Sequence, residues 1–218
     1  MNPNLKAKLD NQYYSRSRNW PSFFDIKNGA KILDIGCGRG VLGGYLQEKY
    51  FSKVTGVDIV SGNIPIASAV LHKAVLGDVE LMDLSLLGGD FDYIIFSDSL
   101  EHLLEPQVTL EAIKHLLASN GSVLIAIPNI RNYRVIFPLL FNDQWEYQDE
   151  GLLDRTHFRF FTQSSICNLL HRCGYQIEAL YLDLPLSSKV GALNICTFGV
   201  FRKILTAHYF LKACLRKS

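Results

Sequence analysis

The stretch Lys31-Ile-Leu-Asp-Ile-Gly-Cys-Gly-Arg-Gly40 joins an apolar strand to a glycine-rich turn, and it decides the fold. Its apolar residues before the turn are typical of a parallel strand that is covered on both faces. Gly36, Gly38 and Gly40 allow the backbone to turn sharply and to come close to a ligand. Asp34 stands at the junction, where a carboxylate suits a cationic amino-acid end better than a pyrophosphate. The stretch therefore predicts a site for a nucleoside-bearing cofactor.

Strand-like and helix-like segments alternate along the chain at the spacing of successive βα units, which predicts a mostly parallel sheet with helices on both faces. Strands are expected at residues 31–35, 53–57, 73–76, 93–96, 122–127, 175–182 and 208–215. One helix should begin at Pro106 and stop at Asn120-Gly121. Another should begin after the N-cap Thr162 and close at Gly174. The apolar segment 190–205 also suggests a helix.

Four aspartates mark the ends of the first four strands that we expect: Asp34, Asp58, Asp78 and Asp98. In open parallel sheets, ligands bind outside the carboxyl ends of the strands, so one cofactor could touch all four acids. Asp58 follows Gly40 by 18 residues, a spacing that allows its carboxylate to accept both hydroxyls of a ribose.

These residues together resemble the class I S-adenosylmethionine-dependent methyltransferases. The resemblance implies a Rossmann-like α/β fold, a three-layer αβα sandwich whose seven-stranded sheet is mostly parallel with the last strand antiparallel. Asp34, Gly36, Cys37, Gly38 and Gly40 match the first motif of that family. The resemblance further implies that the cofactor S-adenosylmethionine contacts Asp58 and Ile59 at the ribose, Asp78 and Val79 at the adenine, and Ser97 near the sulfonium, under a cover of Tyr13 and Tyr14.

The family resemblance implies methyl transfer to a small-molecule acceptor, most simply at oxygen. Residues 150–162 resemble a subgroup of bacterial small-molecule methyltransferases associated with surface polysaccharide or lipid-linked glycans, which suggests a sugar or glycan-linked acceptor. His102 and His157 are the candidate general bases, and either histidine could instead serve local structure. Arg155, together with Tyr133, is a candidate for contact with the acceptor.

Two other classes of function remain as alternatives. An NAD(P)-dependent oxidoreductase would need a third glycine where Val41 stands, and it needs no acid at the position of Asp34. A non-catalytic module could keep the same fold and cofactor.

We expect one domain over residues 1–218, with an insertion at about residues 129–161 that forms a lid. Its apolar segment Tyr133–Phe141 contains Pro138, which should break any long helix. We expect the apolar side of this lid to pack on the sheet, and a pocket for a lipid-linked acceptor is the alternative. For residues 190–201 the alternatives are a packed helix and peripheral contact with a membrane surface.

The composition of the chain indicates which kinds of partner and which cellular compartment to expect. The net charge of +1 and the absence of a long basic block argue against nucleic acid as a partner. Five cysteines without a Cys-x-x-Cys pair predict reduced thiols in a cytoplasmic protein, with neither a disulfide framework nor a metal site. The first ten residues lack an apolar core, and no segment reaches about 18 uninterrupted apolar residues, so we expect neither secretion nor a membrane span.

Overall fold

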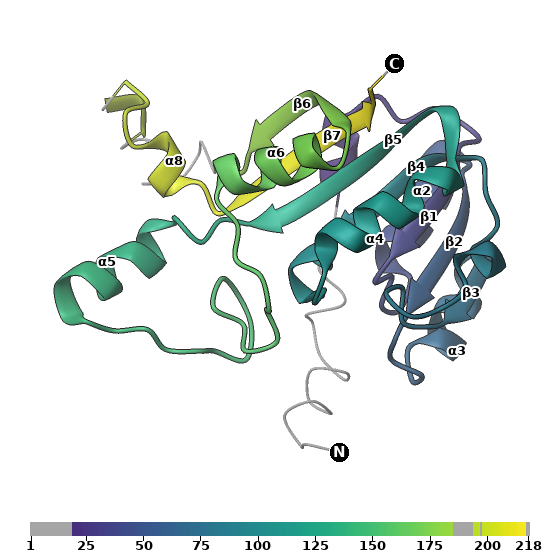
Figure 1. Cartoon of the computed structure of the whole chain (residues 1–218), viewed down its shortest axis with the longest axis horizontal. Helices are drawn as coiled ribbons and strands as arrows, with labels where there is room; N and C mark the ends of the chain where they lie inside the picture. The colour runs from purple at the N-terminus through teal and green to yellow at the C-terminus, as the bar shows by residue number, and fades with distance from the viewer. Residues whose placement is uncertain (1–18, 185–193, 197, 217–218) are drawn as a thin grey trace.

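The computed structural model describes residues 19–184, 194–196 and 198–216, and it shows one sheet flanked by helices (Figure 1). The sheet has seven strands in the order β3-β2-β1-β4-β5-β7-β6. β7 is antiparallel to both of its neighbours, whereas β1 to β5 are parallel to one another. The strands are β1 (Lys31–Ile35), β2 (Lys53–Asp58), β3 (Lys73–Leu76), β4 (Phe91–Ser97), β5 (Leu117–Pro128), β6 (Tyr175–Leu182) and β7 (His208–Leu215). The predicted fold class is thus confirmed.

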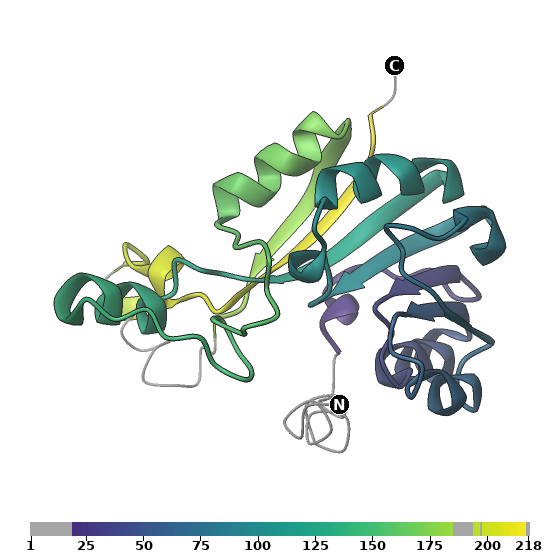
Figure 2. The same ribbon diagram turned by 60° about the horizontal axis from the view of Figure 1, so that its bottom comes forward.

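The helices form a layer on each side of this sheet (Figure 2). The layers consist of α2 (Val41–Tyr50) and α3 (Ile64–Ser68) on one face and α4 (Pro106–Ala112) and α6 (Gln163–Arg172) on the other. The helices α5 (Tyr133–Asn142) and α8 (Arg202–Leu205) lie beyond the edge of the sheet (Figure 1). Alternation along β1 decides which layer each strand residue meets. Leu33 belongs to a buried cluster with α4 and α6, whereas Ile32 belongs to a second cluster with α2 and α3.

The end of α4 differs from the sequence prediction. The helix stops at Ala112, a 3₁₀ turn follows, and β5 begins at Leu117, so Asn120-Gly121 lies inside the strand. The pairing of β4 with β5 shifts register between Phe91 and Tyr93 at this point. A Cβ on Gly121 would lie 2.6 Å from the Phe91 carbonyl oxygen, so the glycine accommodates a bulge and does not end a helix.

Three further sequence expectations fail in the C-terminal half. α5 continues through Pro138 for ten residues, so the proline does not break it. α5 is exposed along most of its length, and Val135 alone among its residues is buried, so its apolar side does not pack on the sheet. The continuous helix expected over 190–205 is also wrong, because Phe198 and Gly199 have φ angles of 51° and 76° and only α8 follows them. Residues 185–193 lie outside the described part.

Among the described residues, no helix combines the length and the apolar character that crossing a bilayer requires.

Candidate active site

A cavity of about 520 Å³ opens at the carboxyl ends of β1 to β4. This volume falls in the range of about 300–1,000 Å³ that is usual for small-molecule sites. Its walls come from the turn after β1, the ends of β2 and β3, the loop after β4, and three residues of the later insertion, Asp154, Thr156 and Phe158. The location is the one expected for a ligand of an open parallel sheet.

The turn after β1 requires glycine at its first position. The backbone N–H groups of Gly36 and Cys37 both donate to the carbonyl oxygen of Val57, at 2.9 and 3.1 Å, which ties the turn to β2. Gly36 has a φ of 77°, and a Cβ there would lie 2.7 Å from the Cβ of Ser99. The Ser99 hydroxyl in turn donates to the Ile35 carbonyl oxygen at 2.6 Å. The missing side chain keeps the backbone open at the floor of the cavity.

Asp58 is held rigidly at the end of β2. Its Oδ2 accepts a hydrogen bond from the Gly38 N–H at 2.8 Å, and its Oδ1 accepts from Val60 N at 2.8 Å and from the Asn63 amide at 3.2 Å. Each carboxylate oxygen can accept more than one hydrogen bond. Asp58 is therefore pre-oriented toward the cavity that it lines, and it retains acceptor capacity for a ligand hydroxyl.

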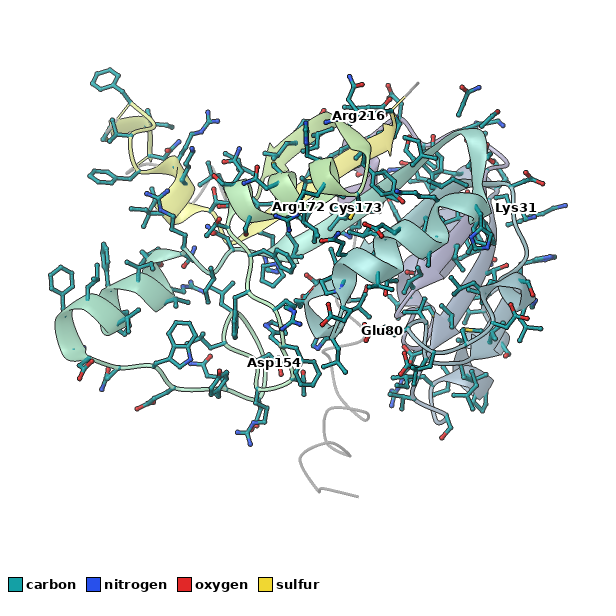
Figure 3. The ribbon with its side chains drawn as sticks, in the orientation of Figure 1. Lys31, Glu80, Asp154, Arg172, Cys173 and Arg216 are labelled. Atoms are coloured by element: carbon teal, nitrogen blue, oxygen red, sulfur yellow. The ribbon has the colours of Figure 1, made fainter. Side chains whose placement is uncertain are left out.

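The loop after β3 closes another side of the cavity. Asp78 Oδ1 accepts from Glu80 N at 2.9 Å, which forms a tight turn at the strand end. The Glu80 carboxylate then accepts from the backbone N–H groups of Leu104 and Glu105, at 2.9 and 2.7 Å. This contact joins the loop after β3 to the loop after β4, and nothing in the sequence pattern pointed to it. Glu80 is labelled in Figure 3, beside the lower end of α4.

Two polar residues, Ser97 and Asp98, lie at the end of β4. Ser97 accepts a hydrogen bond from the Trp20 indole N–H at 3.1 Å, and both side chains are buried. Asp98 has a φ of 51°, and its carboxylate lies 3.4 Å from His208 Nε2 at the start of β7. Trp20 and His208 are distant in sequence from the strand ends, so sequence analysis could not find these contacts.

The predicted cofactor residues Asp34, Gly36, Cys37, Gly38, Asp58, Ile59, Asp78, Val79 and Ser97 all line the cavity. Gly40 does not line it. A Cβ on Gly40 would lie 3.0 Å from Leu71 and 3.4 Å from Ala67, so this glycine allows α2 and α3 to approach each other. Tyr13 and Tyr14 lie outside the described residues. Burial raises the pKa of the Cys37 thiol, which keeps it protonated and unsuited to act as a nucleophile.

The two candidate histidines lie together at the edge of the cavity. Their rings meet edge to face with centroids 4.8 Å apart. His102 lines the cavity, and its Nδ1 lies 3.0 Å from the carbonyl oxygen of Thr156. Because a carbonyl oxygen only accepts, Nδ1 must carry the proton, and in the neutral ring Nε2 then holds the lone pair.

His157 differs from His102 in its surroundings. Its side chain is 3% exposed, and its Nε2 lies 3.8 Å from Glu101 Oε1. Burial, followed by the neighbouring His102, lowers the pKa of His157 to about 4. His157 is therefore neutral at pH 7.

Glu101, His102 and His157 each offer a ligand atom within 4.8 Å of the other two. Such a set has the donors of a small divalent-ion site. The sequence prediction of no metal site stays a prediction.

A second cavity adjoins the first and has aromatic walls. It is lined by Tyr147, Arg155, His157, Phe158 and Phe160, and Phe158 lines both cavities. Trp145 meets Phe160 edge to face at a centroid distance of 5.7 Å. Asp154 caps the turn below, accepting from both the N–H and the hydroxyl of Thr156, at 2.9 and 2.7 Å. Asp154 is labelled in Figure 3, in the insertion beside this group of rings.

The two residues predicted to contact the acceptor lie in different places. Arg155 lines the second cavity and pairs with Asp149 at 2.8 Å. Tyr133 begins α5, where its hydroxyl accepts from Arg134 Nε and its ring meets that of Phe137, so it lines neither cavity.

The cavity therefore fits an adenosyl sulfonium, with a bare turn at Gly36 and an oriented carboxylate at Asp58. A family model described as a methyltransferase domain matches residues 11–180. The chain is similar to a ubiquinone biosynthesis O-methyltransferase of Aeromonas salmonicida, at 28% identity over 75% of this chain and 71% of that protein. A protein of the same name from Pseudomonas aeruginosa is 30% identical over 51% of this chain and 50% of its own length.

Solved structures share the fold. An S-adenosylmethionine-dependent methyltransferase from Archaeoglobus fulgidus superposes with a TM-score of 0.65 at 19% identity, covering 96% of this chain and 97% of that one. One from Mesorhizobium loti gives a TM-score of 0.64 at 16% identity, covering 92% and 99%.

Proposed function

Because the chain belongs to the S-adenosylmethionine-dependent methyltransferase family, we propose that it transfers a methyl group to a hydroxyl oxygen of a small aromatic acceptor. S-adenosylmethionine supplies the electrophilic methyl group, so the protein has mainly to position the two reactants. Correct alignment contributes on the order of 7–11 kcal/mol, whereas a general base adds about 10²–10⁴-fold in rate.

The observation that carries this proposal is the aromatic cavity beside the cofactor cavity. Phe158 forms a wall that the two cavities share, and Tyr147 and Phe160 form the other aromatic walls. Aromatic side chains favour an acceptor ring through stacked or edge-to-face contacts. The relatives that are named as O-methyltransferases of ubiquinone biosynthesis support transfer to oxygen on such a ring.

We assign the role of general base to His102. It lines the cofactor cavity, and its Nε2 holds the lone pair that would take the hydroxyl proton. His157 is the poorer base because its pKa of about 4 lies far below the working pH. Its neutral ring instead packs edge to face against the ring of His102, with the two ring centroids 4.8 Å apart, and it lines the aromatic cavity.

The test is turnover with acceptors that differ in one chemical feature. A catechol, an alkyl glycoside and an alkyl amine are each incubated with the protein and S-adenosylmethionine, and release of S-adenosylhomocysteine is measured. We expect release with the catechol and none with the amine. Turnover with the glycoside alone would restore the sugar acceptor and refute the aromatic one, and turnover with the amine alone would refute transfer to oxygen.

A further inference from the structure

One end of the molecule exposes apolar side chains from two segments that are distant in sequence. In α5, Phe137, Leu140 and Phe141 are exposed by 48%, 68% and 76%. In the segment before α8, Phe198 and Val200 are exposed by 98% and 76%. We call these five residues the distal patch. Side chains of both segments project from this end of the molecule, beyond the edge of the sheet (Figure 3).

The two segments are fastened together by buried asparagines. The Asn129 amide donates to the carbonyl oxygens of Lys203 and Thr206, at 2.9 and 2.8 Å. The Asn132 amide, at the N-cap of α5, donates to the same Thr206 oxygen at 2.8 Å. Figures 1 and 2 both show α5 and α8 as neighbours at this end. Because both amides are fully buried, the distal patch is held as one unit.

The two segments that carry the distal patch contain cations and no acid, and the nearest acid along the chain is Asp143, at the C-cap of α5. Arg131, Arg134, Arg202 and Lys203 are all exposed, and residues 130–141 and 194–205 contain no aspartate or glutamate. The chain as a whole carries a net charge of only +1, so these four cations are concentrated locally. A second copy of this surface would bring like charges together, whereas an anionic surface complements them.

We propose that the distal patch docks on a lipid bilayer that contains anionic headgroups. Aromatic and aliphatic side chains enter the boundary between headgroups and acyl chains, and the arginines and the lysine contact the headgroup phosphates. This combination of exposed apolar side chains and adjacent cations is typical of peripheral membrane contact. The proposal goes beyond the acceptor chemistry and does not depend on it.

Docking at this place would have a consequence for the active site. The chain from α5 leads directly through Trp145 and Tyr147 into the aromatic cavity, so this cavity is close in sequence to the docked end. An acceptor that dissolves in lipid could then enter without crossing much water. The first test below uses no acceptor, so its failure is distinct from failure of the proposed methyl transfer.

The electrostatic part is tested by co-sedimentation of the full chain with vesicles of phosphatidylcholine, with and without phosphatidylglycerol. We expect binding only when phosphatidylglycerol is present, and weaker binding as salt rises. The double substitution Arg202→Gln and Lys203→Gln should weaken binding about twenty-five-fold, since each cation near an anionic surface contributes about fivefold. Equal binding to both kinds of vesicle, or no binding to either, would overturn the proposal.

The apolar part has a matched control within the chain. Phe198→Ser removes a side chain of the distal patch, and Phe51→Ser removes another exposed phenylalanine, at the end of α2, that also has a positive φ. We expect Phe198→Ser to weaken vesicle binding more than tenfold and Phe51→Ser to leave it unchanged. Equal effects of the two substitutions would overturn the proposal. A dimer in sedimentation equilibrium that Phe198→Ser dissociates would also overturn it, because a second copy would then cover the patch.

Discussion

Two regions of this molecule are built in opposite ways. We call β1 to β4 with the loops at their carboxyl ends the cofactor half, and α5 with α8 the distal end. In the cofactor half, buried strands deliver each polar group to one edge of the sheet, and backbone N–H groups then orient it, as at Asp58. At the distal end, α5 buries only Val135 and is held by side-chain amides of Asn129 and Asn132. The comparison indicates that the first region is shaped to hold a ligand in fixed geometry, whereas the second presents its surface outward.

The histidine pair at the edge of the cofactor cavity provides the largest expected effect. His102→Gln should lower turnover by about 10²–10⁴-fold and change the affinity for S-adenosylhomocysteine much less, because the substitution removes the base while glutamine still fills its place in the cavity wall. Single-turnover rates and calorimetry measure the two quantities separately. Glutamine is a matched replacement because its amide can still donate to the Thr156 carbonyl.

Treatment of the wild-type protein with a chelator distinguishes a general base from a metal ligand at His102. If Glu101, His102 and His157 hold a divalent ion, a chelator should abolish turnover in the wild-type protein. Our assignment expects no change on chelation, and a chelator-dependent loss that an added divalent ion restores would contradict it.

The second prediction concerns stability and the burial of His157. Its pKa is lowered from 6.5 to about 4 in the folded protein, so between these values the unfolded chain binds more protons. Stability should therefore fall as pH drops from about 6.5 to about 4, and this residue should account for about 3 kcal/mol of that loss. Denaturant unfolding of wild type and His157→Gln at pH 7 and pH 4.5 measures the difference.

The variant should show a smaller pH dependence than the wild type over this range. Carboxylates also titrate in this pH range, but the wild type and the variant share them. An identical pH dependence would mean that His157 is not buried as a neutral ring.

The third and smallest prediction concerns the cofactor half alone. Asp58→Ala should weaken binding of S-adenosylhomocysteine by tenfold or more, since hydrogen bonds to a charged group contribute about 1.5–3 kcal/mol. Asn63→Ala is the control, because it removes one of the bonds that orient Asp58 and leaves the carboxylate in place. Calorimetry should show a smaller loss for the control, and equal losses would indicate that Asp58 serves the loop and not the ligand.

The two regions also differ in how far sequence could predict them. The strand ends of the cofactor half follow from local patterns, namely an apolar run, a glycine turn and an acid, and all but Gly40 of the residues predicted there line the cavity. The contacts of Trp20 with Ser97 and of Glu80 with the loop after β4 join distant segments, so no local pattern reveals them.

At the distal end, the apolar content of residues 133–141 suggested packing on the sheet, but α5 is held by buried amides and exposes most of its apolar side chains. An apolar segment indicates that a helix can have an apolar face, but it does not indicate what covers that face. Gly121 misled for a related reason, since a glycine that ends a helix and one that allows a bulge look alike in sequence.

The most direct test of the central claim is a crystal structure of the protein grown with S-adenosylhomocysteine. We expect electron density in the cavity at the ends of β1 to β4, with the backbone of Gly36 against the ligand and the ribose hydroxyls within hydrogen-bond distance of Asp58. Density for the compound at any other place, with this cavity holding only solvent, would contradict that claim.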